Sequence, residues 1–451
     1  MNFLRNIEQV YRRILSIREI EENTTLQWLF GGLLFYFFVT FQQWMGSSAI
    51  TVERATNAVC WPYFQECGRL YFLHYLPSGY SHTTFYMGMF GIMLSIVYLM
   101  WRGHWARAHM LLLLLFLWKA FVGYVLSYTI LGMYDTYHLV LTASLLFLPH
   151  KEYFTKIIFV TLYFVSATIK FYPSWILGTY FSSLQSGLPL FPDALTPLLT
   201  NSVIFEQVVG CWFLLSKHKI AQRLSLVYFT IFHLYSGTLV LYNYPAASLL
   251  PLLILFGPMY RYQRPPLSWK SAAGWIVVVA LFLLQIPSLK HDVDTVRMTT
   301  ANNRYGMWMF DSNHQCVMAV RYFYAPEITL TKSSSETLAG STCTTRECVV
   351  KKDVYEENGQ WVREERVESA ISWQRCDPYQ HWRALKNLCS TDIPRIAMTF
   401  DHSINGEPFY RIIDESDACS LEYKAFGKNT WIKAPPEAPP VGLPLKNIYR
   451  Y

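Results

Sequence analysis

Seven ionisable side chains lie inside or beside long apolar runs of this sequence, and they are the residues best placed to do chemistry there. They are Lys119, Asp135, His138, Lys170, Glu206, His233 and His291. An unpaired charge in an apolar setting is costly, so groups of this kind are candidates for function. Lys170 ends one apolar run and precedes a chain reversal around Pro173 and Gly178, where its amine is either an interfacial anchor or a base.

Each of these groups also has a purely structural interpretation. A lysine near the end of a membrane span commonly extends its amine to the interface, which would make Lys170 an anchor. We expect Lys119 and Glu206 to form a structural ion pair across helices. A histidine at a helix end, such as His138, is more often a satisfied polar contact than a catalyst. Residue types alone therefore leave the function open.

The composition indicates a membrane protein with an aqueous part. Of 451 residues, 52% are hydrophobic, 17% aromatic and only 15% charged, which is richer in rings and poorer in charge than an ordinary soluble protein. The long apolar segments all precede residue 290, and the remainder has ordinary soluble composition. The net charge of +7 is concentrated in loops between apolar runs, without a basic stripe among the aromatic residues, so nucleic-acid binding is not expected.

The apolar runs predict the fold class. They fall at about 27–46, 83–101, 108–132, 138–149, 156–170, 201–216, 224–242, 245–259 and 273–289. Several are shorter than the roughly 20 residues of a simple span, which indicates tilted or partly buried helices. We therefore expect a multi-pass α-helical membrane bundle of about nine spans, followed by a small α+β extracytoplasmic domain.

Charge and proline content set the expected domain boundaries. Lys and Arg occupy every second connection between the apolar runs, which places those connections in the cytoplasm and the tail on the opposite side. We expect a cytoplasmic segment over 1–26, the helical membrane domain over 27–290, the α+β domain over 291–425 and a Pro-rich tail over 426–451.

Cysteine usage supports an oxidising compartment for the tail. Eight of nine cysteines lie on the side assigned as non-cytoplasmic, and Cys211 alone falls in a predicted span. The disulfide candidates are Cys60, Cys67, Cys316, Cys343, Cys348, Cys376, Cys389 and Cys419. Their pairing is left open, and the compartment is the periplasm or exterior of a bacterium or the lumen of the endoplasmic reticulum. No paired Cys-x-x-Cys and no His-Glu-x-x-His occurs, so no metal site is predicted.

The tail contains local signals for two hairpins and a helix. Val349–Val354 and Trp361–Val367 flank a turn with Asn358-Gly359, and Ile396–Phe400 and Phe409–Ile413 flank Asn405-Gly406. Asp377-Pro378 predicts a helix start, with an acidic cap and proline at the first helical position, and the helix should run to about Leu388.

Several blocks together resemble a known family. Tyr163-Phe164, Ala167, Lys170, Trp175 and Gly178 are similar to the segment that carries the active-site lysine of vitamin K-dependent gamma-glutamyl carboxylases, within the wider horizontally transferred transmembrane (HTTM) family. Further blocks are Tyr134–Leu139, Phe232–Leu234 with Pro245–Phe256, His291-Asp292 with Tyr305–Met309 and His314-Gln315, and Trp373–Leu388 with Ile396–Asp401, Ser403–Asn405 and Arg411–Asp414. They cover about residues 28 to 420 in the family's order, but Thr136 and Tyr137 replace its paired asparagines.

The resemblance implies a chemistry and a set of site residues. Lys170 would deprotonate vitamin K hydroquinone, whose anion reacts with O2 to give a strongly basic alkoxide and finally the epoxide. The alkoxide removes a glutamate γ-proton, and the carbanion adds CO2. His138 and His233 would stabilise or shuttle charge, and no metal is needed. Quinone or substrate binding is implied for Trp308, Tyr305, His291 and Trp175.

The same resemblance implies partners, and departures from it keep alternatives open. The partners are a glutamate-containing protein or peptide, the lipid bilayer and a quinone reductase. Residues 291–451 form a much shorter soluble part than animal carboxylases carry, which puts coupling to carboxylation in doubt. The alternatives are a quinol epoxidase or oxidase that does not carboxylate, and a non-enzymatic membrane receptor or transporter in which Lys170 binds an anion or serves as an anchor.

Overall fold

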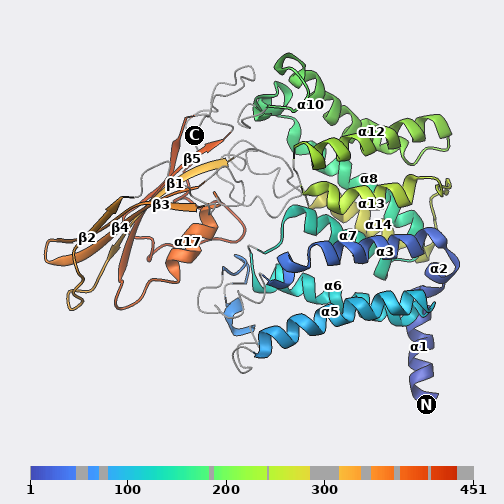
Figure 1. The fold of residues 1–451 in the computed structure, drawn as a ribbon, viewed down its shortest axis with the longest axis horizontal. Helices are drawn as coiled ribbons and strands as arrows, with labels where there is room; N and C mark the ends of the chain where they lie inside the picture. The colour runs from blue at the N-terminus through green and yellow to red at the C-terminus, as the bar shows by residue number, and fades with distance from the viewer. Residues whose placement is uncertain are drawn as a thin grey trace. The chain divides into compact units, whose positions relative to one another are not determined.

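The computed structural model describes most of the chain in two units (Figure 1). The described residues are 2–46, 59–64, 66–70, 80–128, 130–181, 187–240, 243–284, 314–336, 347–369, 376–404 and 408–433. The first unit comprises Met1–Ala55, Glu66–Thr168 and Val203–Gln285, and the second comprises Thr56–Gln65, Ile169–Ser202 and Ile286–Tyr451. The segment that begins beside Lys170 therefore clusters with the C-terminal part of the chain, not with the helices that flank it in sequence.

The first unit is built from helices. Those in the described residues are α1 (Asn2–Ile14), α2 (Ile17–Glu22), α3 (Thr24–Val39), α5 (Tyr80–Trp101), α6 (Trp105–Phe121), α7 (Met133–Phe147), α8 (Lys151–Ala167), α11 (Cys211–Phe213), α12 (Lys219–Thr238), α13 (Tyr244–Phe256) and α14 (Ala272–Leu283). The last residues of α10 (Thr196–Phe205), from Val203 on, also belong to this unit. Single π-helical turns follow α3, α6 and α10, at Gln42–Gly46, Val122–Leu126 and Glu206–Gly210.

The core of this unit is a group of helices that are apolar on most sides. α13 packs against α3, α7 and α12, and α8 packs against α7 and α14. Figure 1 shows α3, α7 and α13 running side by side. Nine of the thirteen residues of α13 are buried, as expected for an apolar helix that other helices cover on most sides.

The expectation of about nine membrane spans is wrong. Each of the nine apolar runs overlaps a helix, but among the described residues only Trp105–Leu126 and Lys151–Lys170 are long and apolar enough to cross a membrane. Of these two, the Lys151–Lys170 stretch is 78% buried inside the protein, as a core helix of a soluble protein also is. A bundle of nine spans is therefore not indicated.

Helix length explains most of the difference. At about 1.5 Å per residue, the 13 residues of α13 extend roughly 20 Å, whereas the apolar core of a bilayer is about 30 Å thick. α14 has only 12 residues, and Pro251 interrupts the hydrogen-bond ladder inside α13. Apolar runs of this length indicate burial, and in this protein other helices supply much of that burial.

The second unit contains short helices and one antiparallel sheet. In its described residues the α-helices are α9 (Pro173–Ile176), the first part of α10, and α17 (Pro378–Lys386). The strands are β1 (His314–Phe323), β2 (Ser333–Glu336), β3 (Glu347–Glu357), β4 (Gln360–Ser369), β5 (Arg395–Ile404) and β6 (Tyr410–Glu415), in the order β2-β3-β4-β1-β5-β6. Met398 and Phe400 of β5 lie on the buried face, where Phe400 contacts His381 of α17.

The local predictions for this unit are confirmed. β3 and β4 form a hairpin whose turn residues Asn358 and Gly359 both have positive φ, at 53° and 75°. β5 and β6 form the second hairpin. α17 begins at Pro378, and the carboxylate of Asp377 accepts a hydrogen bond from the backbone N–H of Tyr379. The predicted turn Asn405-Gly406 falls outside the described residues.

Disulfides form among the predicted cysteines, and two of them lie inside the second unit. Cys316 of β1 is bonded to Cys376, next to the cap of α17, and Cys389 is bonded to Cys419. Cys60 and Cys67 are also disulfide-bonded. Cys211 is a buried free thiol. Cys343 and the side chain of Cys348 lie outside what the structure describes.

Candidate functional site

Lys170 is a buried residue, not a surface one. It ends the 3-10 turn Thr168–Lys170 that continues α8, and its side chain is only 1% exposed. The Nζ atom lies 5.5 Å from the centroid of the Trp175 ring. An interfacial anchor would expose its amine to water, so burial against an aromatic face argues against that role.

The fold around Trp175 holds this ring in place. Tyr172 is extended and Pro173 starts α9, so the chain reverses directly after Lys170. The indole N–H of Trp175 donates a hydrogen bond to the carbonyl oxygen of Thr200, at 3.2 Å. Gly178 has φ of +78°, and a Cβ there would lie 2.7 Å from Thr196 Cγ2, so the reversal requires glycine.

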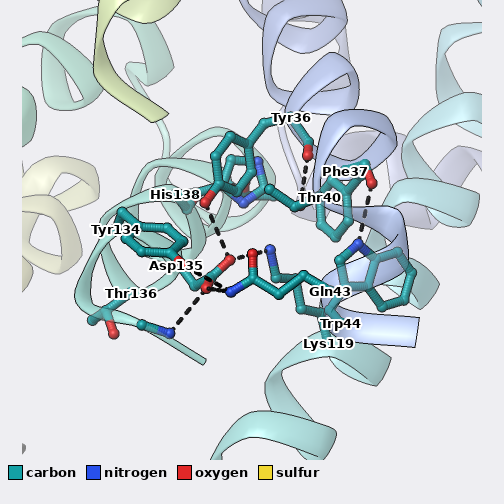
Figure 2. Close-up of polar contacts among 12 residues, drawn as sticks. Tyr36, Phe37, Thr40, Gln43, Trp44, Lys119, Tyr134, Asp135, Thr136 and His138 are labelled. Carbon is teal, nitrogen blue, oxygen red and sulfur yellow. Dashed lines mark hydrogen bonds and ion pairs between the residues drawn. The ribbon is translucent and has the colours of Figure 1, made fainter. Parts of the chain in front are cut away.

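His138 lies in a second cluster, shown in Figure 2. Its side chain is fully buried, with the ring centroid 4.2 Å from that of Tyr36 and 4.7 Å from that of Phe37 on α3. The Nε2 atom lies 2.9 Å from the carbonyl oxygen of Leu33. Because a carbonyl only accepts, Nε2 carries the proton. Burial, and then the nearby charge of Lys119, lower the pKa of His138 well below its usual value, so the imidazole is neutral.

A buried ion pair adjoins His138. Lys119 Nζ of α6 lies 2.7 Å from Asp135 Oδ1 of α7, and the two side chains are 0% and 1% exposed. The hydroxyl of Tyr36 donates to the same carboxylate oxygen, and the backbone N–H of Gly132 donates to the other. The half-buried Gln43 reaches this carboxylate and the hydroxyl of Tyr134 (Figure 2).

The predicted pairing of Lys119 with Glu206 is not what the structure shows. Asp135 is the partner of Lys119, because the first turn of α7 faces α6 across the bundle. Glu206 starts the π-helical turn after α10, about half buried, and desolvation raises the pKa of its carboxyl group. The sequence distance from Lys119 is 16 residues to Asp135 and 87 to Glu206, but neither separation identifies a partner across helices.

His233 lies in a third cluster, formed by α8, α12 and α13. It is fully buried, and its Nε2 atom is hydrogen-bonded to the hydroxyl of Tyr163. Ser248 Oγ lies 3.3 Å from Nδ1, and the Tyr244 ring packs 5.4 Å from the imidazole. Burial lowers the pKa of His233 to about 3, so this imidazole is also neutral at ordinary pH.

The structure brings some predicted site residues together and separates others. Lys170 and Trp175 lie together in the second unit. His138 and His233 both belong to the first unit, but they sit in separate clusters with different partners. His291, Tyr305 and Trp308 fall outside the described residues. No group of three metal-ligating side chains occurs in the described part of the chain.

Sequence reasoning missed the aromatic partners of the two histidines. Tyr36 was not among the candidates, and Tyr163 was named only as part of the block that carries Lys170, although each contacts a buried imidazole directly. One signal was present: Asp135 and His138 are three residues apart, so a helix places them on one face. Tyr36 lies on α3 and Tyr163 on α8, so neither is close in sequence to the histidine that it contacts.

Comparisons of the chain with protein-family models, with curated proteins and with solved structures found no match.

Proposed function

We propose that this chain is a vitamin K-dependent gamma-glutamyl carboxylase in which Lys170 is the base. The observation that carries the proposal is the burial of the Lys170 amine against the ring of Trp175, with 1% of the side chain exposed. Burial removes part of the solvation that favours a charged amine, and this is the effect by which a buried lysine can serve as a base. The sequence blocks that resemble the carboxylases supply the rest of the argument.

The proposed reaction uses vitamin K hydroquinone, O2, CO2 and a glutamyl residue as substrates. The neutral amine of Lys170 accepts a proton from a quinol hydroxyl, and oxygenation of the quinol then yields the epoxide and water. The base generated in that oxidation removes a γ-proton of glutamate, and the new carbon–carbon bond forms with CO2. Proton transfer by a positioned side chain contributes about 10²- to 10⁴-fold to a rate.

The two histidines supply neutral imidazoles to this reaction. His138 holds its proton on Nε2, and His233 is held between Tyr163 and Ser248. A neutral imidazole can accept a proton at its unprotonated nitrogen. Quinone or substrate binding is proposed for Trp175 and, from the resemblance alone, for His291, Tyr305 and Trp308.

The proposal also assigns a compartment to the second unit. Its disulfides Cys316–Cys376 and Cys389–Cys419 favour a non-cytoplasmic location, in a periplasm or the lumen of the endoplasmic reticulum. The basic residues Arg12, Arg13 and Arg18 favour a cytoplasmic N-terminus. The partners would be a membrane, a glutamate-containing peptide and a quinone reductase. Protease protection in sealed vesicles, with tags at either end of the chain, tests this placement.

The activity is tested with the purified full chain. Reduced vitamin K, O2, labelled bicarbonate and a glutamate-containing peptide are supplied, and epoxide and incorporated label are measured. We expect both products from the native protein and a loss of both, by at least about 100-fold, in Lys170→Ala. Lys170→Arg is the matched control, because arginine keeps the cation but is not deprotonated near neutral pH. Full activity in Lys170→Arg would overturn the role of Lys170 as the base.

The same measurement separates the alternative functions. Epoxide without incorporated label would identify a quinol epoxidase that does not carboxylate. Neither product, together with quinone binding that Lys170→Ala leaves unchanged, would reject both enzymatic functions.

A further inference from the structure

Two aromatic rings of α3 are shared by the buried ion pair and by His138. Lys119 Nζ lies 4.7 Å from the centroid of the Tyr36 ring and 5.4 Å from that of the Phe37 ring. The imidazole of His138 packs against the same two rings, at 4.2 Å and 4.7 Å. Figure 2 shows these side chains converging from α3, α6 and α7.

The ion pair also holds Tyr36 by a direct bond. The Tyr36 hydroxyl donates to Asp135 Oδ1 at 3.2 Å, the oxygen that Lys119 approaches at 2.7 Å. The position of the Tyr36 ring is therefore set at one end by Asp135 and along its face by Lys119. Because His138 packs on that ring, its imidazole plane depends on where the ion pair places Tyr36.

The two ring nitrogens of His138 have different roles, and the orientation of the ring determines where Nδ1 points. Nε2 donates to the Leu33 carbonyl, whereas Nδ1 is buried and has no hydrogen-bond partner among the described residues. In the neutral ring Nδ1 is therefore the acceptor. Rotating the ring would break the bond to Leu33 and turn Nδ1 elsewhere.

We propose that the Lys119–Asp135 ion pair is a positioning device for His138, acting through the ring of Tyr36. The inference rests on the proposed function for its consequence in catalysis, but the orientation of His138 can be measured without any activity. Lys119 and Asp135 are positioning residues in this account, and neither has to touch a substrate.

The competing explanation is that the pair only stabilises the bundle. Removing one partner of a buried ion pair leaves an uncompensated charge, whereas replacing both with neutral residues of similar size is often neutral for stability. The double variant Lys119→Met/Asp135→Asn therefore removes the charges while the fold is retained. Tyr36→Phe is a second, milder variant, because it keeps the ring and deletes only the bond to Asp135.

The test combines kinetics with the 15N signals of His138. The full chain is labelled with 15N-histidine, and the His138 signals are assigned from their disappearance in His138→Gln. We expect the native protein to show a protonated Nε2 and an unprotonated Nδ1. In Lys119→Met/Asp135→Asn, with a thermal midpoint near the native value, these signals should shift, and kcat for epoxidation should fall about 10- to 100-fold with KM for the quinol unchanged. Tyr36→Phe should shift the same signals by less.

A second buried ion pair provides the matched control. Lys156 and Glu152 of α8 form a pair whose side chains are 3% and 11% exposed, and Asn23 also donates to Glu152. Lys156→Met/Glu152→Gln should leave the His138 signals and kcat as in the native protein. Unchanged His138 signals in the Lys119/Asp135 double variant would overturn the positioning role. If the native protein forms no epoxide, the proposed function fails, and the His138 signals alone decide the inference.

Discussion

Lys119 Nζ and Asp135 Oδ1 lie 2.7 Å apart, and the two side chains are almost completely removed from solvent. A pair of this kind is sensitive to the loss of one member. Lys119→Met should lower the free energy of unfolding by about 3–5 kcal/mol, because Asp135 then remains buried without a counter-charge. Adding Asp135→Asn should recover most of that loss. Thermal and denaturant unfolding of the native protein, Lys119→Met and the double variant measures these changes in stability. Equal destabilisation in the single and double variants would contradict the prediction.

Trp175 is expected to act through its ring more than through its indole N–H. Trp175→Phe keeps an aromatic face for Lys170 and loses the bond to Thr200, so stability should fall by about 1 kcal/mol. Trp175→Leu also loses the face and much of the packing, and should cost about 3 kcal/mol with a larger loss of carboxylation. Unfolding and product formation are measured on both variants. Equal stability and equal carboxylation in Trp175→Leu and Trp175→Phe would show that the aromatic face is not required.

The reversal after Lys170 depends on glycine at position 178. Gly178→Ala places a Cβ in a backbone of positive φ and 2.7 Å from Thr196 Cγ2, so it should destabilise the second unit by more than 1 kcal/mol. Gly359 has φ of +75° with open space around it, so Gly359→Ala should show the backbone cost alone. Thr196→Ser should partly rescue Gly178→Ala. Absence of rescue would show that the steric contact is not the cause.

Reduction of the disulfides should weaken the second unit specifically. The Cys389–Cys419 bond closes 30 residues of chain, so Cys389→Ser/Cys419→Ser should lower stability by about 4 kcal/mol in the chain-entropy estimate. Peptide mapping without reductant should recover both Cys316–Cys376 and Cys389–Cys419. Cys211→Ala is the control, since Cys211 is a free buried thiol and its removal should not change the response to reductant. A native protein insensitive to reductant would contradict this prediction.

His233 should contribute a pH dependence to stability. Its pKa is about 3 in the folded protein because of burial, and about 6.5 in the unfolded chain. The unfolded state therefore binds the extra proton as the pH falls below about 6.5, and stability is lost from there down to about pH 3. In His233→Gln the free energy of unfolding should fall less steeply with decreasing pH, by up to about 1.4 kcal/mol per pH unit. Identical pH profiles for the two proteins would show that His233 does not titrate in this way.

Local signals in the sequence were sufficient for much of the second unit. Asn358-Gly359 predicts a hairpin because its backbone requires positive φ, and β3 and β4 form that hairpin. Asp377-Pro378 predicts the start of α17 because a carboxylate can satisfy a free N–H at a helix end. Each signal involves residues a few positions apart, so no distant part of the chain has to be known.

The helical unit shows where such reasoning stops. The apolar runs correctly indicated helices, but a run of 13 residues such as α13 is equally apolar whether lipid or other helices cover it. Only the packing against α3, α7 and α12 shows that protein covers this helix. The partner of Lys119 was predicted wrongly for the same reason. Burial of a charged side chain predicts that an opposite charge lies nearby, but it does not identify the residue that carries this charge.

For the candidate site, residue types alone identified the chemically capable groups: the amine of Lys170 and the imidazoles of His138 and His233. Their state depends on the folded protein. It buried Lys170 against Trp175, left His138 neutral beside Tyr36, and joined Asp135 to Lys119. The type of a residue determines which protonation states its side chain can adopt. Desolvation and neighbours from distant segments determine which of those states the folded protein favours.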